Sequence, residues 1–322
     1  MSSIFYVSST FYFMKILIVC SKNSGRIAPF ITDQVEALRN SGVVCEYFTI
    51  EGKGVGGYLQ HRRPLLRKII DFNPDIIHAH YGLSGLLANT QWKVPVVTTY
   101  HGSDINEAMV FPFSWVSIKL SRFNIFVSQK NREKAKAVEK ANAALIPCGV
   151  DTGLFRPMDK SEARKELSLD QTAKYVLFAG AFDNRVKNPE LAKAAVAKTE
   201  GVRLLELKGY TRQQVALLMN AVDACLMTSF SEGSPQFIKE ALACNCPVVS
   251  VDVGDVKEMI LDVAGCKLVS YDEQIITDEL EKILITGNRC NGKFKIEQKK
   301  MESYKVANQL IEIYGQICNE KK

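Results

Sequence analysis

Short apolar runs alternate with longer segments of helical periodicity along this chain from Met14 onward. Such runs predict strands buried on both faces, because helices cover both sides of a parallel sheet. They lie at residues 15–20, 43–50, 75–80, 94–100, 124–127, 144–146, 174–180, 202–207, 224–229, 248–251 and 267–269. Helices are predicted at residues 30–39, 61–72, 129–140, 161–167, 189–198, 212–221, 277–285 and about 296–318. The alternation predicts an α/β fold with parallel sheets.

One segment without periodicity interrupts the alternation. Residues 147–157, PCGVDTGLFRP, are rich in proline and glycine, which predicts a linker between two domains. A length of 322 residues also favours two α/β domains of ordinary size. A second glycine-rich segment, GKGVGGY at residues 52–58, is predicted as a loop. It lacks the G-x-G-x-x-G spacing after the first strand, so a dinucleotide fold of the dehydrogenase type is not supported.

Composition narrows the class of protein. A net charge of +6 is compatible with anionic substrates or a membrane surface, but it is too weak to indicate a nucleic-acid partner. The nine cysteines are scattered, which favours reduced thiols in a cytoplasmic protein, and Cys244 and Cys246 do not have zinc-ligand spacing. No apolar run is long enough to span a bilayer. Residues 1–13 lack a basic leader and a cleavage site, and we interpret them as an extension.

The stretch at residues 229–259 holds the strongest candidate for chemistry. Glu232 and Glu240 stand eight residues apart, and Ser234 followed by Pro235 predicts a helix start with serine as N-cap and proline as first helical residue. The backbone N–H groups at such a start attract a phosphate.

In this helix those N–H groups belong to Gln236 and Phe237. A carboxylate beside a phosphate site suits a hydroxyl group, so the pattern indicates a sugar nucleotide as ligand. Two solvated acidic residues near a helix start are the alternative interpretation.

Together these motifs resemble family 4 of the glycosyltransferases, retaining enzymes of GT-B architecture. The resemblance rests on E-x7-E at 232–240 with its EGSP, CPVV and VGDV flanks, IPCGVDTGLFRP at 146–157, HGSD at 101–104 and FAGAFDNRVKNPELAKAA at 178–195. It covers nearly the whole chain from Met14 to the C-terminus.

The resemblance implies two Rossmann-like domains with parallel sheets facing a cleft. Residues 14–153 and 303–322 are expected to form the acceptor-binding domain, with the last helix crossing back onto it. Residues 154–302 are expected to form the donor-binding domain. The hinge between them, at Pro147–Pro157, is expected to close the cleft and exclude water.

Individual residues take roles through the same resemblance. Glu232 is expected at the hydroxyls of the donor sugar, Glu240 at the ribose, and Lys187 at the donor phosphates. The family usually has an arginine directly after the strand glycine, but Ala181 stands there. Arg185 either replaces that arginine or is a solvated loop charge, in which case Lys187 acts alone.

Two further residues are expected to complete the site. His101 corresponds to a histidine under the donor sugar, with a packed loop histidine as the alternative. Gly25, in the loop after the first strand, lets the backbone approach the diphosphate. His78 and His80 share one strand face and suggest metal ligands, but packing at the end of the sheet is the favoured interpretation because no partner ligand follows.

The resulting hypothesis is a retaining transferase that moves a hexose-type sugar from a nucleoside-diphosphate sugar to a glycan or lipid-linked acceptor, without metal or cofactor. A nucleotide-sugar epimerase and a non-catalytic GT-B scaffold protein are the alternatives. The basic helix at 61–68, with Phe111, Phe113 and Trp115, is compatible with contact to an anionic membrane at its cytoplasmic face; a solvated amphipathic helix is the other interpretation.

Overall fold

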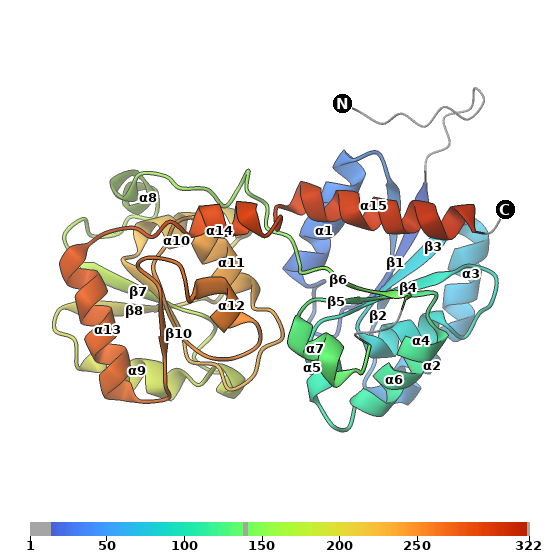
Figure 1. The fold of residues 1–322 in the computed structure, drawn as a ribbon, viewed down its shortest axis with the longest axis horizontal. Helices are drawn as coiled ribbons and strands as arrows, with labels where there is room; N and C mark the ends of the chain where they lie inside the picture. Colours follow the sequence, from blue (N-terminus) through green and yellow to red (C-terminus); the bar gives the residue numbers. More distant parts are fainter. Residues whose placement is uncertain (1–13, 138–140, 321–322) are drawn as a thin grey trace.

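Two α/β lobes, each built around a parallel sheet, make up the computed structural model, which describes residues 14–137 and 141–320 (Figure 1). The sheet of the N-terminal lobe has the order β2-β1-β3-β4-β5-β6 and consists of Lys15–Ser21 (β1), Val44–Ile50 (β2), Ile76–His80 (β3), Val96–Tyr100 (β4), Phe123–Phe126 (β5) and Ala143–Leu145 (β6). The sheet of the C-terminal lobe has the order β11-β10-β9-β7-β8 and consists of Lys174–Phe178 (β7), Val202–Glu206 (β8), Ala224–Met227 (β9), Val248–Val251 (β10) and Lys267–Val269 (β11). Neighbouring strands are parallel throughout, as the predicted fold class requires.

Helices connect the strands and cover both sheets. The N-terminal lobe contains Pro29–Asn40 (α1), Gly54–Leu59 (α2), Arg62–Phe72 (α3), Gly82–Ala88 (α4), Ser103–Asn106 (α5), Phe111–Leu120 (α6) and Gln129–Lys134 (α7). The C-terminal lobe contains Lys160–Glu166 (α8), the 3₁₀ turn Arg185–Lys187, Pro189–Ala197 (α9), Arg212–Ala221 (α10), Gln236–Ala243 (α11), Val256–Ile260 (α12), Glu273–Thr286 (α13) and Gly292–Gln298 (α14).

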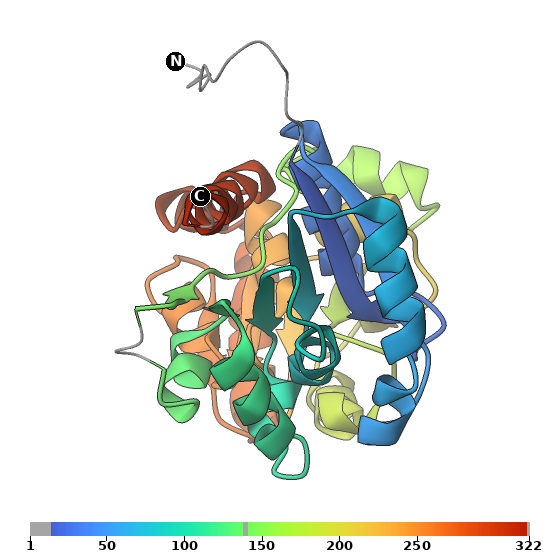
Figure 2. The ribbon, with the colours of Figure 1, turned by 90° about the vertical axis from the view of Figure 1, so that its right-hand side faces the viewer.

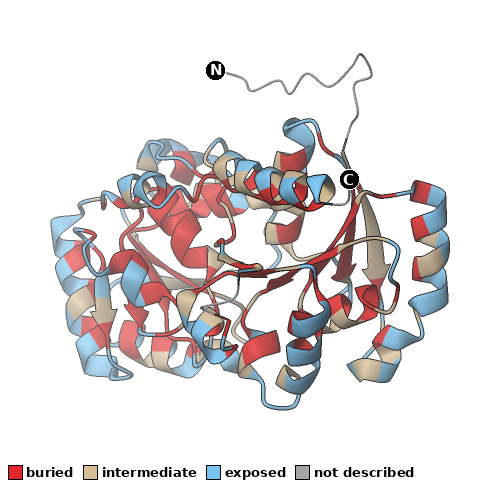
Figure 3. Cartoon of the chain, turned by 45° about the vertical axis from the view of Figure 1, so that its right-hand side comes forward, coloured by how far each residue is buried: buried red, intermediate tan, exposed pale blue. Residues whose placement is uncertain are grey.

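Strand β1 shows why the apolar runs form buried strands. Ile16 and Ile18 point to the side of the sheet covered by α1, whereas Leu17 and Val19 point to the side covered by α3 and α4. Because side chains alternate across a strand, a sheet covered on both sides needs an uninterrupted apolar run. Helices lie on both sides of the N-terminal sheet (Figure 2), the inner strands are buried, and the outward faces of the helices are exposed (Figure 3).

The last helix, α15 (Ser303–Asn319), packs against α1 of the N-terminal lobe (Figure 1). Leu310 and Tyr314 join the core cluster on that side of the sheet. Where the chain returns between the lobes, Val150 pairs with Glu302, and the N–H of Val150 donates to the carbonyl of Met301 at 2.8 Å. Two segments of chain therefore connect the lobes side by side.

The glycine-rich segment at residues 52–58 is not wholly a loop, as was predicted, because it contains helix α2. The backbones of Gly52 and Gly57 touch: a Cβ on Gly52 would lie 2.4 Å from the carbonyl oxygen of Gly57. Tyr58, at the end of the segment, is buried in the core. Glycine here permits close packing of a short helix rather than a turn.

Helix ends also differ from the prediction. The single helix predicted at about 296–318 is two helices, α14 and α15, because Lys300 adopts a left-handed conformation with φ of 54° and breaks the run. The helix predicted at 129–140 ends at Lys134, and residues 138–140 lie outside the described residues, as do the extension 1–13 and residues 321–322.

Helices α4 and α6 are among those that have no counterpart in the prediction. Helix α4 contains two glycines, and α6 lacks an apolar stripe on one side, so neither has the usual helical pattern. None of the helices in the described part of the chain has the length and apolar character needed to cross a bilayer.

Candidate active site

Loops from the two lobes meet at the carboxyl ends of their parallel strands, which is where open α/β sheets bind ligands. The loop after β4 contains His101 and Gly102, and the loop after β9 contains Gly233. A Cβ on Gly233 would lie 2.1 Å from the carbonyl oxygen of His101, and a Cβ on Gly102 would lie 2.7 Å from the Cα of Gly233. The contact between the lobes therefore requires glycine on both sides.

The start of α11 differs from the predicted cap. The helix begins at Gln236, Pro235 occupies the N-cap position, and no side chain caps the helix. The hydroxyl of Ser234 instead donates to the carboxylate of Asp255, in the loop before α12. The prediction of Ser234 as N-cap was wrong because this tertiary partner takes the hydroxyl.

The backbone N–H groups of Gln236 and Phe237 have no hydrogen-bond acceptor among the described residues. The side chain of Gln236 faces the other way, and its Nε2 donates to the carbonyl of Gly149 in the linker at 2.7 Å. An unpaired helix start beside the loop contact is suited to an anion.

Lys187 and Glu232 form an ion pair, with 2.5 Å between Nζ and Oε1. Lys187 ends the 3₁₀ turn, and its side chain packs over Gly180, where an added Cβ would lie 2.8 Å from the lysine Cγ. Thr228, after β9, fixes this turn by donating to the carbonyls of Lys187 and Asn188. The structure thus joins two predicted site residues that lie 45 positions apart.

Arg185 is not brought to this pair. Its side chain is exposed on the same turn, and it forms no hydrogen bond or ion pair with the described residues. Of the two basic residues predicted at the donor phosphates, only Lys187 contacts Glu232.

Glu240 is held by a residue that the sequence analysis missed. Arg212, the first residue of α10, donates from one nitrogen to Oε1 of Glu240 at 2.7 Å and to Oδ2 of Asp33 at 2.6 Å. Asp33 lies on α1, so the guanidinium joins carboxylates of the two lobes. Burial raises the pKa of Glu240 and of Asp33, and Arg212 opposes both shifts.

His101 lies within a stack of rings. Its Nε2 is 3.0 Å from Nδ1 of His80, its Nδ1 is 3.7 Å from Sγ of Cys148, and its ring centroid is 4.7 Å from those of Phe30 and Tyr81. Burial, with smaller contributions from His78 and Lys239, lowers the pKa of His101 to about 3. The imidazole is therefore neutral at pH 7, and both ring nitrogens already face protein groups.

The two other histidines of this group are packed in the core. His78 stacks on His80 at 4.6 Å between ring centroids and contacts the hydroxyls of Tyr314 and Thr99. No group of three or more potential metal ligands occurs among the described residues.

Asp104 shapes the loop that carries His101, and the sequence analysis gave it no role. Its buried carboxylate accepts hydrogen bonds from the backbone N–H groups of His101 at 3.0 Å, Gly102 at 2.8 Å and Gly82 at 3.0 Å. Burial raises the pKa of Asp104 to about 6 while these bonds oppose the rise. Its position in HGSD, three residues after the histidine, was the available signal.

Gly25 lies in the turn after β1, with φ of 81°, and an added Cβ would meet nothing within 4 Å. Its neighbours Ser24 and Arg26 line a hollow of about 330 Å³ in the N-terminal lobe. Tyr81 and Asp104 line the same hollow, which links it to the His101 loop.

Sequence models of two known families match the chain. Residues 18–154 match Glycosyltransferase Family 4, and residues 161–286 match Glycosyl transferases group 1. The two matches lie one in each lobe and together span most of the chain.

Curated relatives are identical to the chain at about a quarter of the aligned positions. A putative teichuronic acid biosynthesis glycosyltransferase, TuaC of Bacillus subtilis, is 27% identical over 220 residues, which cover 59% of this chain and 56% of the relative. A D-inositol 3-phosphate glycosyltransferase of Mycobacterium marinum is 28% identical over 244 residues, covering 61% and 52%. The chain thus spans about half the length of the curated relatives it matches.

Solved structures share the fold at low identity. Sucrose-phosphate synthase from Thermosynechococcus elongatus has a TM-score of 0.80 at 17% identity, covering 94% of this chain and 99% of that one. Anabaena HepE in complex with UDP-glucose has a TM-score of 0.71 at 16% identity, covering 94% and 100%.

Proposed function

The chain belongs to glycosyltransferase family 4, and on that premise we propose that it transfers a sugar, with retention of configuration, from a nucleoside-diphosphate sugar to an acceptor hydroxyl. The observation that carries the proposal is the Lys187–Glu232 pair beside the unpaired start of α11. A cation, a helix start and a carboxylate are the groups that a diphosphate and an adjoining sugar require.

The donor would bind mainly to the C-terminal lobe. Its phosphates would face Lys187 and the N–H groups of Gln236 and Phe237, and its sugar hydroxyls would face Glu232. Oε2 of Glu240 would accept a hydrogen bond from the ribose. Oε1 already accepts one from Arg212, and no described residue donates to Oε2. Gly25 and Arg185 stay peripheral to this set.

Transfer would proceed on one face of the sugar. The bond between the anomeric carbon and the phosphate oxygen breaks, and the acceptor oxygen forms a new bond to the same face. The acceptor proton passes to the departing phosphate, whose negative charge Lys187 and the helix start stabilise. The transition state resembles an oxocarbenium ion.

The opposing lobe would supply orientation rather than proton transfer. A neutral His101, with both ring nitrogens facing His80 and Cys148, is suited to packing beneath the sugar. The Gly102–Gly233 contact would exclude water from the reacting centre. The hollow beside Tyr81 and Asp104 has room for an acceptor.

The comparisons support a nucleotide sugar as donor, and we propose a glycan or lipid-linked molecule as acceptor. Related structures were solved with UDP and UDP-glucose, and TuaC is named for teichuronic acid biosynthesis. We propose polysaccharide or glycoconjugate biosynthesis as the setting and the cytoplasm as the compartment. The nine cysteines, free in this structure, suit a reducing environment.

A panel of nucleoside diphosphates and nucleotide sugars in a thermal-shift assay identifies the donor, since a ligand that binds the folded state raises its melting temperature. Turnover of that donor is then measured with the wild type, K187A, E232A and the control K208A. Lys208 pairs with Asp183 on the exposed surface, so K208A should retain wild-type turnover.

Turnover should fall by at least about 100-fold in K187A and E232A. Wild-type rates in both variants would refute the site. Isomerised donor formed without acceptor would identify the epimerase, and absence of both transfer and donor hydrolysis would favour the scaffold.

A further inference from the structure

Most of the large apolar side chains of helix α6 lie on its outer side. Its buried side carries Ser114, Ser117 and Ile118, and its outer side carries Pro112, Phe113, Trp115, Val116, Lys119 and Leu120. The side chains of Phe113, Trp115, Val116 and Leu120 are between 37% and 44% exposed. A helix of a water-surrounded lobe normally has the opposite arrangement.

The packing against α4 explains this orientation. A Cβ on Gly82 would lie 2.0 Å from the hydroxyl of Ser114, and a Cβ on Gly85 would lie 2.2 Å from the hydroxyl of Ser117. Small residues on both helices let the backbones approach closely. Turning α6 over would press its aromatic side chains against the glycines, so the apolar outer face is fixed by the fold.

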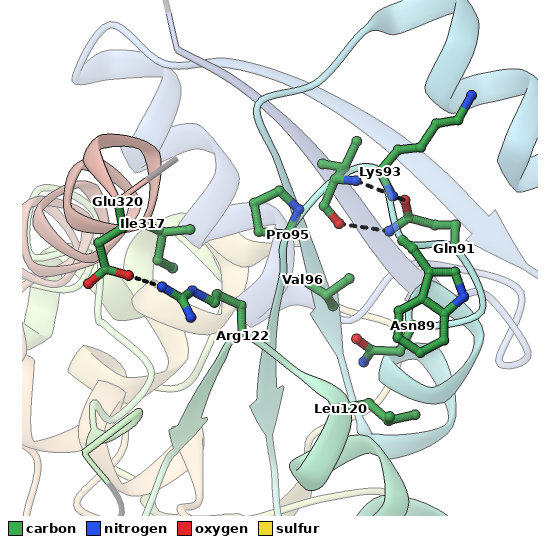
Figure 4. A pocket seen from close by; sticks show the side chains of 11 residues that line it. Asn89, Gln91, Lys93, Pro95, Val96, Leu120, Arg122, Ile317 and Glu320 are labelled. Atoms are coloured by element: carbon green, nitrogen blue, oxygen red, sulfur yellow. Dashed lines mark hydrogen bonds and ion pairs between the residues drawn. The ribbon is translucent and has the colours of Figure 1, made fainter. Parts of the chain in front are cut away.

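The apolar surface continues past the end of α6. Trp92, in the loop between α4 and β4, is 86% exposed, and it lines a hollow of about 330 Å³ together with Leu120. Figure 4 shows Lys93, Leu120 and Arg122 around this hollow. We call α6 and residues 91–93 the α6 surface. It contains both tryptophans of the chain, and apolar patches of this kind mark interaction sites.

Charge is distributed unevenly between the lobes. Residues 14–150 contain 17 Lys and Arg against 10 Asp and Glu, a net charge of +7, whereas residues 151–322 contain 24 against 25, a net charge of −1. On the α6 surface, Lys119 lies over the ring of Trp115 with Nζ 3.5 Å from its centroid, and Lys93 follows Trp92. Arg62, at the start of α3, donates to the carbonyl of Thr90 beside the same loop.

We propose that the α6 surface docks on an anionic lipid bilayer. Aromatic residues with flanking lysines suit the boundary between headgroups and acyl chains, and a basic lobe suits negatively charged lipid. Val110, directly before α6, lines the hollow beside Tyr81 and Asp104. Docking would therefore hold the acceptor side of the cleft close to the lipid, a consequence that rests on the proposed function, whereas the docking itself does not.

The two tryptophans provide the assay. Vesicles of phosphatidylglycerol mixed with phosphatidylcholine should shift the tryptophan emission to shorter wavelength and sediment with the protein. Phosphatidylcholine vesicles should bind at least about tenfold more weakly, and added salt should reduce binding to the anionic vesicles.

Substitutions on α6 test the surface while both tryptophans remain as reporters. The double variant F113S/V116S should bind anionic vesicles at least about tenfold more weakly, and K119A about fivefold more weakly. The matched control I285S/F294S replaces two side chains of the C-terminal lobe that are 83% and 64% exposed, and it should bind like the wild type.

Absence of binding by the wild type, or equal binding by F113S/V116S and I285S/F294S, would overturn the proposal. A dimer in sedimentation velocity that F113S/V116S dissociates, without vesicle binding, would assign the surface to a second copy of the chain and also overturn it. Sugar transfer to a soluble acceptor should be unchanged in F113S/V116S, so a failure of docking is distinguishable from a failure of the transferase.

Discussion

Arg212 is the cation on which carboxylates of both lobes converge, so its replacement by methionine tests the site and the lobe contact together. Methionine keeps an unbranched apolar stem beside Phe155, over whose ring the guanidinium lies at 4.6 Å. It removes the donors to Glu240 and Asp33, whose side chains are 4% and 16% exposed. Neither carboxylate has another ion-pair partner among the described residues.

The expected loss of stability in R212M follows from these exposed fractions. Removing one partner of a buried ion pair costs about 3–5 kcal/mol, because the remaining charge is left without compensation. Arg212 is itself 25% exposed, so solvent screens part of its interaction. We expect R212M to lower the free energy of unfolding by about 2 kcal/mol at pH 7.

The pH dependence has a defined sign. Burial raises the pKa of Glu240 and Asp33, and removing Arg212 removes the opposing effect, so both values in the folded state rise further. A carboxyl group with a raised pKa weakens folding above its unfolded pKa, and the effect disappears below that value, where both states are protonated. The deficit of R212M should therefore be larger at pH 7 and shrink as the pH falls towards about 4.

Urea unfolding of the wild type, R212M and R212M/E240Q at pH 7 and pH 5 measures these differences. The double variant should recover part of the loss, because the buried charge on residue 240 is gone. The control K208M breaks an exposed pair with Asp183 and should unfold like the wild type. The reasoning fails if R212M matches K208M, or if its deficit grows on acidification.

Three further outcomes are expected. Calorimetry should show E240A binding the donor's nucleoside diphosphate at least about tenfold more weakly, and unchanged affinity would place the ribose elsewhere. G233A should lose sugar transfer and show a larger radius of gyration by X-ray scattering, because its Cβ would collide with the carbonyl of His101; wild-type transfer would show that the loops do not meet in the working enzyme. EDTA should leave transfer unchanged, and restoration of lost activity by added manganese would refute the metal-independent proposal.

The sheets were predictable because their inner strands are buried on both faces. An uninterrupted apolar run such as that around Leu17 and Ile18 is typical of such a strand, and these runs place the centre of each sheet. The local backbone conformation was harder to predict from the sequence. Whether Gly52 and Gly57 lie in a loop or pack closely beside a helix depends on which backbone segments approach each other. The sequence shows only that glycine permits such an approach.

Helix α6 illustrates a limit of a different kind. Its serines are buried because Gly82 and Gly85 of α4 leave no room for larger side chains. A polar–apolar pattern assumes that apolar residues face the core, and here tertiary packing reverses that assumption. The reversal cannot be inferred without knowing that α4 and α6 are neighbours.

The residues of the candidate site were also only partly predictable from the sequence. Lys187 and Glu232 were assigned to one site through the family resemblance, and the structure places them 2.5 Å apart. Arg212 was missed because its partner Asp33 is 179 residues away and belongs to the other lobe. An arginine after Thr211 is already explained as part of a capped helix start. The sequence therefore offered no reason to expect its contact with the other lobe.

On the proposed function, Ala181, at the position where the resemblance implies an arginine, has a physical consequence for donor binding. Each glutamate of the E-x7-E motif is held by one cation, Glu232 by Lys187 and Glu240 by Arg212. Under the proposed function, a diphosphate would draw Lys187 away from Glu232, because Arg185 is exposed and forms no ion pair with the described residues. The freed carboxylate would then be available to the sugar hydroxyls. Binding of phosphate and recognition of sugar would thus be coupled through one lysine, and a second cation after Gly180 would weaken that coupling.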